Sequence, residues 1–176
     1  GEITDKVAFL AQQAEERTHN VLMGSLDYQI NFNDDKSSFI AYYGGQQTDR
    51  DHYTGIIPDA PVEQQIFFSN PPYGTSDVRT HQGGLQVNHR FDRFLNGKTT
   101  LTGGIEYVHD DVFDEIPSYQ FLVDQTTKNL GAFVQNDWDI NDKINFLAGF
   151  RLDDHNLVDN AIFSPRLSLL YKFRAV

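Results

Sequence analysis

Residues 130–152 read LGAFVQNDWDINDKINFLAGFRL, and they give the clearest indication of the fold in this sequence. On either side of Asn141 and Asp142, apolar and polar residues alternate with a period of two, which is typical of a β-strand with one apolar face. The apolar positions are Leu130, Ala132, Val134, Trp138 and Ile140, then Ile144, Phe146, Ala148, Phe150 and Leu152. The stretch therefore predicts two long antiparallel strands joined by a tight turn.

The same alternation recurs along the chain and predicts seven strands. We expect them near residues 21–32, 38–48, 80–91, 98–110, 128–140, 143–153 and 162–173. Six of them have a clear apolar face. In the segment 38–48, Phe39, Ala41 and Tyr43 form one partly apolar set and Ile40, Tyr42 and Gly44 form another, so its facing stays open.

Charge separates completely between the two faces of the six clear strands. Within the clearly alternating stretches (22–32, 82–91, 99–107, 130–140, 144–153 and 163–173), nine charged residues fall on the polar face and none on the apolar face: Asp27, Arg90, Glu106, Asp137, Asp139, Arg151, Asp153, Arg166 and Lys172. Arg151, Asp153 and Arg166 are expected to face a lumen and to pair across strands. This pattern favours strands with one face in lipid and the other in water.

The predicted connections alternate between short turns (33–37, 92–97, 141–142) and long loops (49–79, 111–127). Antiparallel strands joined in this way place the turns on one rim and the loops on the other. That is the layout of an outer-membrane barrel with short periplasmic turns and long extracellular loops. Aromatic residues near the turn rim, where an interfacial belt is expected, are Phe32, Phe39, Phe91, Trp138, Phe146, Tyr171 and Phe173.

We therefore predict an all-β fold, an antiparallel up-and-down transmembrane β-barrel segment. A soluble β-sandwich serving as a binding or adhesion module is the alternative, but its strands usually have about 5 to 6 residues, whereas these alternate for about 11. A small eight-stranded outer-membrane protein, with a further strand near residues 6–14, is the second alternative. Residues 1–20 are expected to be the remnant of an extracellular loop with a short helix between Thr4 and Arg17, and residues 21–176 to form the barrel segment.

Composition excludes several other classes of protein. With 14 basic and 25 acidic residues the net charge is −11, which argues against nucleic acid as a partner. The absence of cysteine excludes disulfides, thiolate nucleophiles and cysteine-ligated metals. The six histidines lack the spacing of a zinc site, and no nucleophile stands beside a credible base, so we do not expect an enzyme.

Three ordered motifs resemble strands of the TonB-dependent outer-membrane transporters. Gly131–Trp138 is similar to their aromatic-x-Gln-x-acid-Trp strand, and Phe146–Asp153 is similar to their Leu-x-x-Gly-x-Arg-x-Asp strand. Phe163–Leu167 resembles the Ser-Pro-Arg start of the next strand, and Leu152–Leu157 resembles receptors from the Bacteroidota.

The resemblance implies a segment from the C-terminal half of the barrel of such a receptor in the bacterial outer membrane. Family members carry an N-terminal plug and about 22 strands, so we expect a fragment without its plug. The implied cargo is a metal chelate, namely a corrinoid, haem or siderophore. The implied partners are the remaining barrel and plug, TonB through the plug, outer-membrane lipid and lipopolysaccharide, and a surface lipoprotein.

Two sets of residues in the predicted loops are candidate sites. Aromatic loop tips offer a large contact area at low entropic cost and are candidates for ligand binding, with ordinary loop packing as the alternative: His52, Tyr53, Phe67, Phe68, Tyr73, Tyr119 and Phe121. Loop carboxylates are the hard oxygen ligands that calcium prefers, with solvated charge as the alternative: Asp49, Asp51, Asp110, Asp111, Asp114 and Glu115. Calcium is the one cofactor that the sequence suggests.

Overall fold

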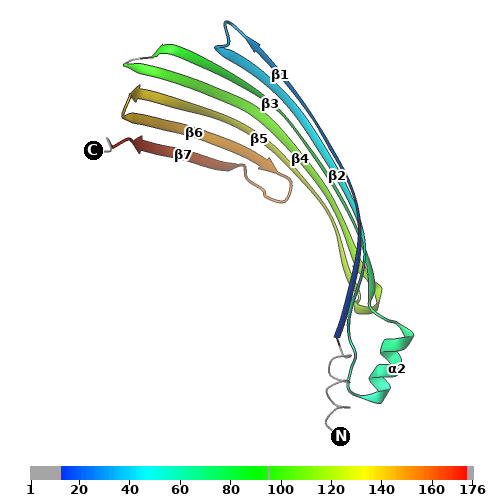
Figure 1. Cartoon of the computed structure of the whole chain (residues 1–176). Helices are drawn as coiled ribbons and strands as arrows, with labels where there is room; N and C mark the ends of the chain where they lie inside the picture. The colour runs from blue at the N-terminus through cyan, green and yellow to red at the C-terminus, as the bar shows by residue number, and fades with distance from the viewer. Residues whose placement is uncertain (1–12, 95, 174–176) are drawn as a thin grey trace. The chain divides into compact units, whose positions relative to one another are not determined.

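The computed structural model describes residues 13–94 and 96–173, and these residues form an all-β protein. Seven antiparallel strands lie in one sheet, in the same order as in the sequence (Figure 1). The strands are β1 (Gln13–Phe32), β2 (Ser37–Ile56), β3 (Tyr73–Phe94), β4 (Gly97–Ile116), β5 (Phe121–Asn141), β6 (Ile144–His155) and β7 (Ile162–Tyr171). This up-and-down sheet confirms the predicted fold class.

The strands are longer than the alternation predicted, because each of the first five contains 20 to 22 residues. The expected long loop 111–127 is therefore wrong, since only residues 117–120 separate β4 from β5. A single turn of 3₁₀ helix, η1 (Pro117–Tyr119), fills that connection. The expected loop 49–79 shrinks to residues 57–72 for the same reason.

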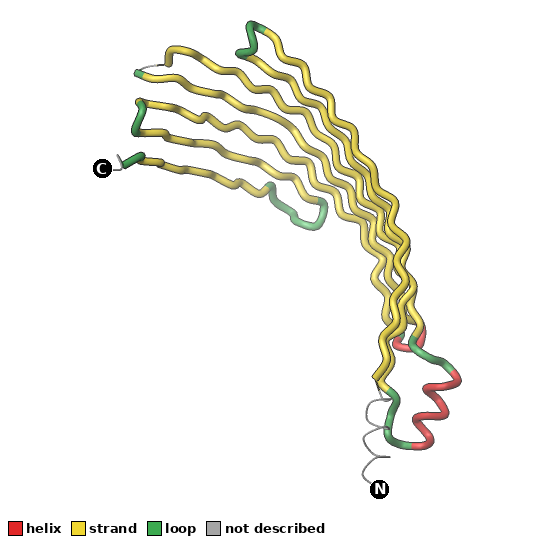
Figure 2. Tube along the Cα trace, in the orientation of Figure 1, coloured by secondary structure: helices red, strands yellow, loops and turns green. Residues whose placement is uncertain are grey.

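The connection between β2 and β3 contains the helix α2 (Pro61–Ser69), which the sequence did not predict (Figure 2). Pro61 occupies the first turn, where a missing backbone N–H costs nothing, and the extended Ala60 precedes it. The helix that the sequence placed between Thr4 and Arg17 is wrong for residues 13–17, which belong to β1. The rest of that segment, and most of the possible eighth strand near 6–14, lies outside the described residues.

Tight turns join the other ends of the strands. In the turn after β1, Asn33, Asp34 and Asp35 all have positive φ angles, of 57°, 53° and 58°, a conformation that Asn and Asp tolerate better than most residues. Lys36 of this turn binds the carboxylate of Asp92 at 2.6 Å, beyond the alternating part of β3. The Lys36 ammonium donates a hydrogen bond that holds the pKa of Asp92 below its usual range.

The chain divides into two compact units. The first contains the described part of Gly1–Met23 together with Gln46–Thr80 and Asp110–Thr126, and so includes α2 and η1. The second contains Gly24–Gly45, His81–His109 and Thr127–Val176, and so includes the tight turns together with β6 and β7.

The described residues contain no buried hydrophobic core. Large apolar side chains stay exposed instead, for example Leu26 (73%) and Leu167 (74%). A β-sandwich needs two sheets that bury such side chains between them, so that alternative is wrong. Within the described chain β1 and β7 are the first and last strands of the sheet and do not pair with each other, so these seven strands do not close. No described helix is long and apolar enough to span a bilayer.

Candidate functional site

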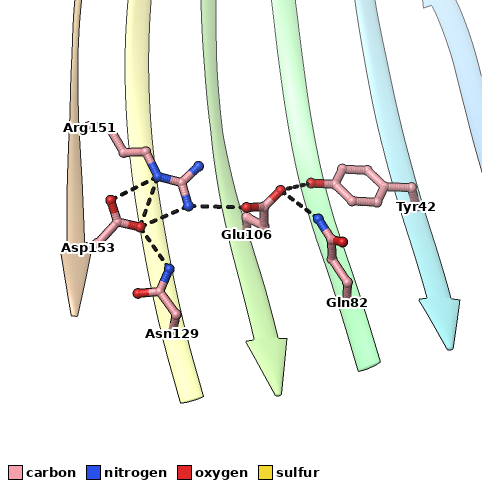
Figure 3. Close-up of polar contacts among 6 residues, drawn as sticks. All are labelled: Tyr42, Gln82, Glu106, Asn129, Arg151 and Asp153. Carbon is pink, nitrogen blue, oxygen red and sulfur yellow. Dashed lines mark hydrogen bonds and ion pairs between the residues drawn. The ribbon is translucent and has the colours of Figure 1, made fainter. Parts of the chain in front are cut away.

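A network of polar side chains crosses one face of the second unit, with Glu106 of β4 at its centre (Figure 3). The hydroxyl of Tyr42 donates a hydrogen bond of 2.5 Å to Oε2 of Glu106, and the amide of Gln82 donates one of 3.1 Å to the same oxygen. The guanidinium of Arg151 lies 3.1 Å from Oε1. Both carboxylate oxygens of Glu106 are therefore satisfied by side chains from three other strands, β2, β3 and β6.

Arg151 carries the network onward to Asp153. Its Nε lies 2.9 Å from both carboxylate oxygens of Asp153, and its Nη2 lies 2.8 Å from Oδ1. The amide of Asn129 on β5 donates a further bond of 2.9 Å to Oδ1. The network thus links β2, β3, β4, β5 and β6 through charge-assisted bonds, which are stronger than neutral ones.

Two glycines make the network possible because its side chains must pass over neighbouring strands. Tyr42 lies over Gly84 of β3, and a Cβ atom built on Gly84 would come 2.5 Å from the tyrosine hydroxyl. Arg151 lies over Gly131 of β5, where a Cβ atom would meet its guanidinium group. Side chains from β2 and β6 therefore reach the carboxylate on β4 across two strands that lack a side chain at the crossing point.

The network identifies the faces of β2, which the sequence left open. Tyr42 shares a face with Glu106 and Arg151, which we call the polar face. Tyr43 lies on the opposite, apolar face, because successive side chains of a strand alternate; there its hydroxyl lies 2.7 Å from Nδ1 of His81. Phe39 and Ala41 join Tyr43 on the apolar face by the same alternation.

A hollow of about 610 Å³ adjoins the network, and its lining includes Tyr42, Glu106, Arg151 and Arg166. Of the charges that the sequence expected to pair across strands, Arg151 does so with Glu106, and its bond to Asp153 lies within β6. Within the described residues Arg166 has no ion-pair partner, so the pairing expected for it is not found there. The hollow therefore presents one neutralised and one unneutralised guanidinium group.

The predicted ligand-binding residues lie in the first unit, but only some of them come together. A hollow of about 330 Å³ lies between α2 and η1. Its lining is Pro58, Glu63, Ile66, Phe67, Asn70, Pro72, Ser118 and Tyr119. Phe67 and Tyr119, which are about 50 residues apart in the sequence, are the two predicted residues that it joins.

The other predicted aromatic residues lie beside this hollow or away from it. Tyr53 and Tyr73 pack against each other with ring centroids 5.0 Å apart, and Phe68 packs on the edge of Phe67. Four of the seven residues were expected in loops but lie in strands: His52 and Tyr53 in β2, Tyr73 in β3 and Phe121 in β5. The description of these four as loop tips is therefore wrong.

Tyr119 also fixes η1 against the sheet. Its hydroxyl donates a hydrogen bond of 3.0 Å to the backbone oxygen of Thr54 on β2. The ring that lines the hollow is thus held at both ends, by its backbone in η1 and by its hydroxyl on β2. A binding surface built from a held aromatic ring loses little entropy when a ligand arrives.

The acidic candidates lie in strands and spread over both faces. Asp49 and Asp51 belong to β2, and Asp110, Asp111, Asp114 and Glu115 belong to β4. Asp114 binds Arg50 at 2.9 Å and lies 3.8 Å from Nε2 of the buried His52. Asp111 accepts a bond of 2.6 Å from Thr126. In the described part of the chain no three His, Asp or Glu side chains form a group that could hold a metal ion, so calcium binding stays a prediction from the sequence.

The polar network was not predicted as a unit. The sequence placed Glu106 and Arg151 on the polar face but did not bring them together, because that requires the register of three strands. The signal that could have found it is glycine inside the predicted strands, at Gly84 and Gly131, because a strand glycine often marks a close approach of a neighbouring group.

The comparison with known proteins agrees with this geometry. A family model described as TonB dependent receptor-like, beta-barrel matches residues 4–175. No curated protein and no solved structure matches the chain. Members of the matching family are transporters of the outer membrane and not enzymes. The chain therefore belongs to the TonB dependent receptor-like β-barrel family and forms part of the barrel of an outer-membrane transporter.

Proposed function

We propose that this chain supplies barrel wall and ligand-recognition surface to a transporter that binds and imports a metal chelate, namely a corrinoid, a haem or a siderophore. The family and the seven-stranded sheet support the part played by the barrel wall. The cargo is proposed from the Bacteroidota-type resemblance of the C-terminal motifs. The observation that carries the recognition role is the hollow between α2 and η1.

This hollow has the chemistry of a binding site for a flat, partly apolar ligand. Its volume of about 330 Å³ falls at the lower end of ligand pockets, which run from roughly 300 to 1,000 Å³. Phe67 and Tyr119 offer ring faces, and Glu63, Asn70 and Ser118 offer polar groups. Aromatic faces with a few polar groups suit a macrocycle or an aromatic chelator better than a small ion.

The polar face of the second unit has a different role in this proposal. The charges of its network, on Glu106, Arg151 and Asp153, compensate one another in part, which suits a wall that faces a water-filled interior and a plug. Arg166 in the polar-face hollow has no ion-pair partner among the described residues and is available to an acidic group of the plug. TonB would act through that plug, and lipopolysaccharide and a surface lipoprotein remain proposed partners of the outer surface.

Mass spectrometry of the small molecules that co-purify with the intact protein tests the cargo directly. Binding is then measured by tryptophan or tyrosine quenching with hemin, cyanocobalamin and a ferric siderophore. We expect one of these three to bind, and none of them binding would contradict the proposal.

Paired aromatic variants test the site. Phe67→Ala and Tyr119→Ala should each weaken binding of the identified chelate about tenfold, since a packed aromatic contact contributes roughly 0.5–1.5 kcal/mol beyond its buried area. Val62→Ala is the control, because Val62 lies on the same helix, is exposed and does not line the hollow. Equal effects of Phe67→Ala and Val62→Ala would place the ligand elsewhere. The same titrations with calcium or with a chelator of calcium test the predicted calcium site.

A further inference from the structure

The apolar face of the second unit carries no charged residue over a band that crosses six strands. Every second residue of a strand lies on this face. None of these residues is Asp, Glu, Lys or Arg between positions 39 and 43 of β2, 81 and 91 of β3, 99 and 109 of β4, or 130 and 140 of β5. The same holds from Ile144 to Leu152 in β6 and from Phe163 to Tyr171 in β7. Contacts on this face confirm the alternation, since Tyr43 meets His81 and Thr99 bonds to Asn136.

Charge appears on the same face once the strands continue past this band, at Lys128 of β5 and Asp154 of β6 in the second unit and at several residues of the first unit. On β2 the residues at alternate positions beyond Tyr43 include Asp49 and Asp51. On β3 they include Asp77 and Arg79, and on β4 Asp111 and Glu115. The hydrogen bond between Thr126 and Asp111 confirms that β4 and β5 keep their facing there. A bilayer interior does not tolerate such a density of charge.

A row of polar aromatic side chains marks the change. On the apolar face, the rings of Tyr43 and His81 stack with centroids 6.1 Å apart. His109 lies 6.5 Å from both His81 and Tyr107, ring centre to ring centre. The row therefore runs across β2, β3 and β4. Rings with an apolar body and a polar tip are characteristic of the membrane–water interface.

The distance between this row and the turn rim matches the height of a bilayer core. Phe91 lies ten positions after His81 on β3, and on β5 Trp138 lies ten positions after Lys128, the nearest charged residue on this face. At about 3.3 Å per residue this is about 33 Å along the strand. With a strand tilt of 35–45°, the height becomes about 23–27 Å, against the roughly 25 Å of the apolar band in outer-membrane barrels.

The apolar face also has a hollow that fits a lipid chain. Its volume is about 340 Å³, and its apolar lining includes Leu26, Leu85, Ile105 and Leu130 around Gly83, while Tyr42 and Glu106 of the polar face also contribute to it. Leu85, Ile105, Leu130 and Gly83 belong to the uncharged band, and Leu26 lies on the first strand, β1. Because Gly83 has no side chain, it leaves the hollow open at that position.

We propose that Tyr43, His81, Tyr107 and His109 lie among the lipid head groups of the outer leaflet. The hydrocarbon core then ends at this row, and the strands of the first unit stand in water. The uncharged band between this row and the turn rim then contacts membrane lipid. This inference rests on the outer-membrane family assignment but adds the position of the boundary, residue by residue.

Single cysteines test the boundary, because the chain has none of its own. Ile105→Cys and Phe113→Cys lie on the same face of β4, on either side of the row, and Val87→Cys and Asp77→Cys do the same on β3. Intact cells that display the whole protein are treated with a membrane-impermeant maleimide. Glu63→Cys on α2 is the control for surface display.

We expect Phe113→Cys and Asp77→Cys to react at rates close to that of Glu63→Cys. Ile105→Cys and Val87→Cys should react at least tenfold more slowly until the protein is unfolded in detergent. Similar rates for Ile105→Cys and Phe113→Cys would overturn the boundary. Protection of Glu63→Cys would instead overturn the surface location of α2, and with it the proposed function. The boundary would then be read from nitroxide labels on the same four cysteines in liposomes, where equal depths at positions 105 and 113 would refute it.

Discussion

The guanidinium group of Arg151 on β6 lies 3.1 Å from the carboxylate of Glu106 on β4, across the strand that separates them. The pair is partly sheltered, since the Arg151 side chain is 32% exposed and that of Glu106 is 20% exposed. An ion pair in such a position costs more to break than a surface pair, because each partner loses its compensation while remaining partly desolvated. The pair therefore ties three strands of the barrel wall together.

Replacing Glu106 with glutamine should destabilise the folded barrel by about 1–3 kcal/mol, because Arg151 keeps its place but loses a charged partner. Urea unfolding in lipid vesicles measures the change. Asp27→Asn, which removes a carboxylate of β1 outside the network, is the control and should change stability by less than about 0.5 kcal/mol. In a double-mutant cycle, Glu106→Gln combined with Arg151→Met should give a coupling energy of about 1–3 kcal/mol. A coupling near zero would mean that the observed contact contributes nothing to stability.

Gly131→Ala should weaken the same network by displacing Arg151, because the new methyl group would occupy the space of the guanidinium. We expect a loss of about 1–3 kcal/mol, which is typical of an overpacked position. The loss should become smaller when Arg151 is already alanine, since only Oδ1 of Asp153 then lies close to the new Cβ atom, at 2.7 Å, on a side chain that the guanidinium no longer holds. Gly24→Ala is the control, because a Cβ atom on Gly24 meets nothing within 4 Å. An equal loss in the presence and in the absence of the Arg151 side chain would show that the cost is one of backbone alone.

The alternation of apolar and polar residues predicted the parts of the strands that have one uncharged face. It failed for the other parts: on β2 it stopped at residue 48 although the strand continues to Ile56, and on β4 it stopped at residue 110 although the strand continues to Ile116. In both places the added residues include acidic side chains at apolar-face positions, Asp49 and Asp51 on β2 and Asp111 and Glu115 on β4. A strand with water on both faces can have polar residues at every position. Its sequence therefore shows no alternation of apolar and polar residues from which a strand could be predicted.

The candidate sites show a similar division. Aromatic character alone selected Phe67 and Tyr119, but it also selected Phe121, which lies outside the hollow. Whether an aromatic residue lines the hollow depends on the positions of α2 and η1, and the alternation pattern predicted neither of these elements. The network around Glu106 depends on residues as far apart as Tyr42 and Arg151, and only the strand register brings them together.

The loss of folding free energy caused by a lysine on the apolar face should show whether that position lies in the bilayer. Ile105→Lys places a charge in the middle of the uncharged band of β4 and should cost about 2–4 kcal/mol, whereas Phe113→Lys lies beyond the row of polar aromatics and should cost about 0–1 kcal/mol. Folding titrations into vesicles compare the two. The side chains are similarly exposed, at 49% and 37%, so burial within the protein does not explain the expected difference. Equal costs would place both positions at the same depth.

We expect Asp114 to stabilise the contacts between β2 and β4 in the first unit. It binds Arg50 at 2.9 Å and faces His52, whose side chain is only 8% exposed. Asp114→Ala leaves the arginine and the buried imidazole without that acceptor, which costs about 1–3 kcal/mol for a sheltered polar group. Since hydrogen exchange in β2 proceeds through local opening, the amides of residues 50–54 should exchange about 10 to 100 times faster. Asp51→Ala removes an exposed carboxylate of the same strand and should leave these rates within about twofold, because surface substitutions away from such contacts have small effects. Faster exchange in both variants would indicate a general effect of charge on β2, and unchanged exchange in both would show that the Arg50–Asp114 contact does not stabilise this unit.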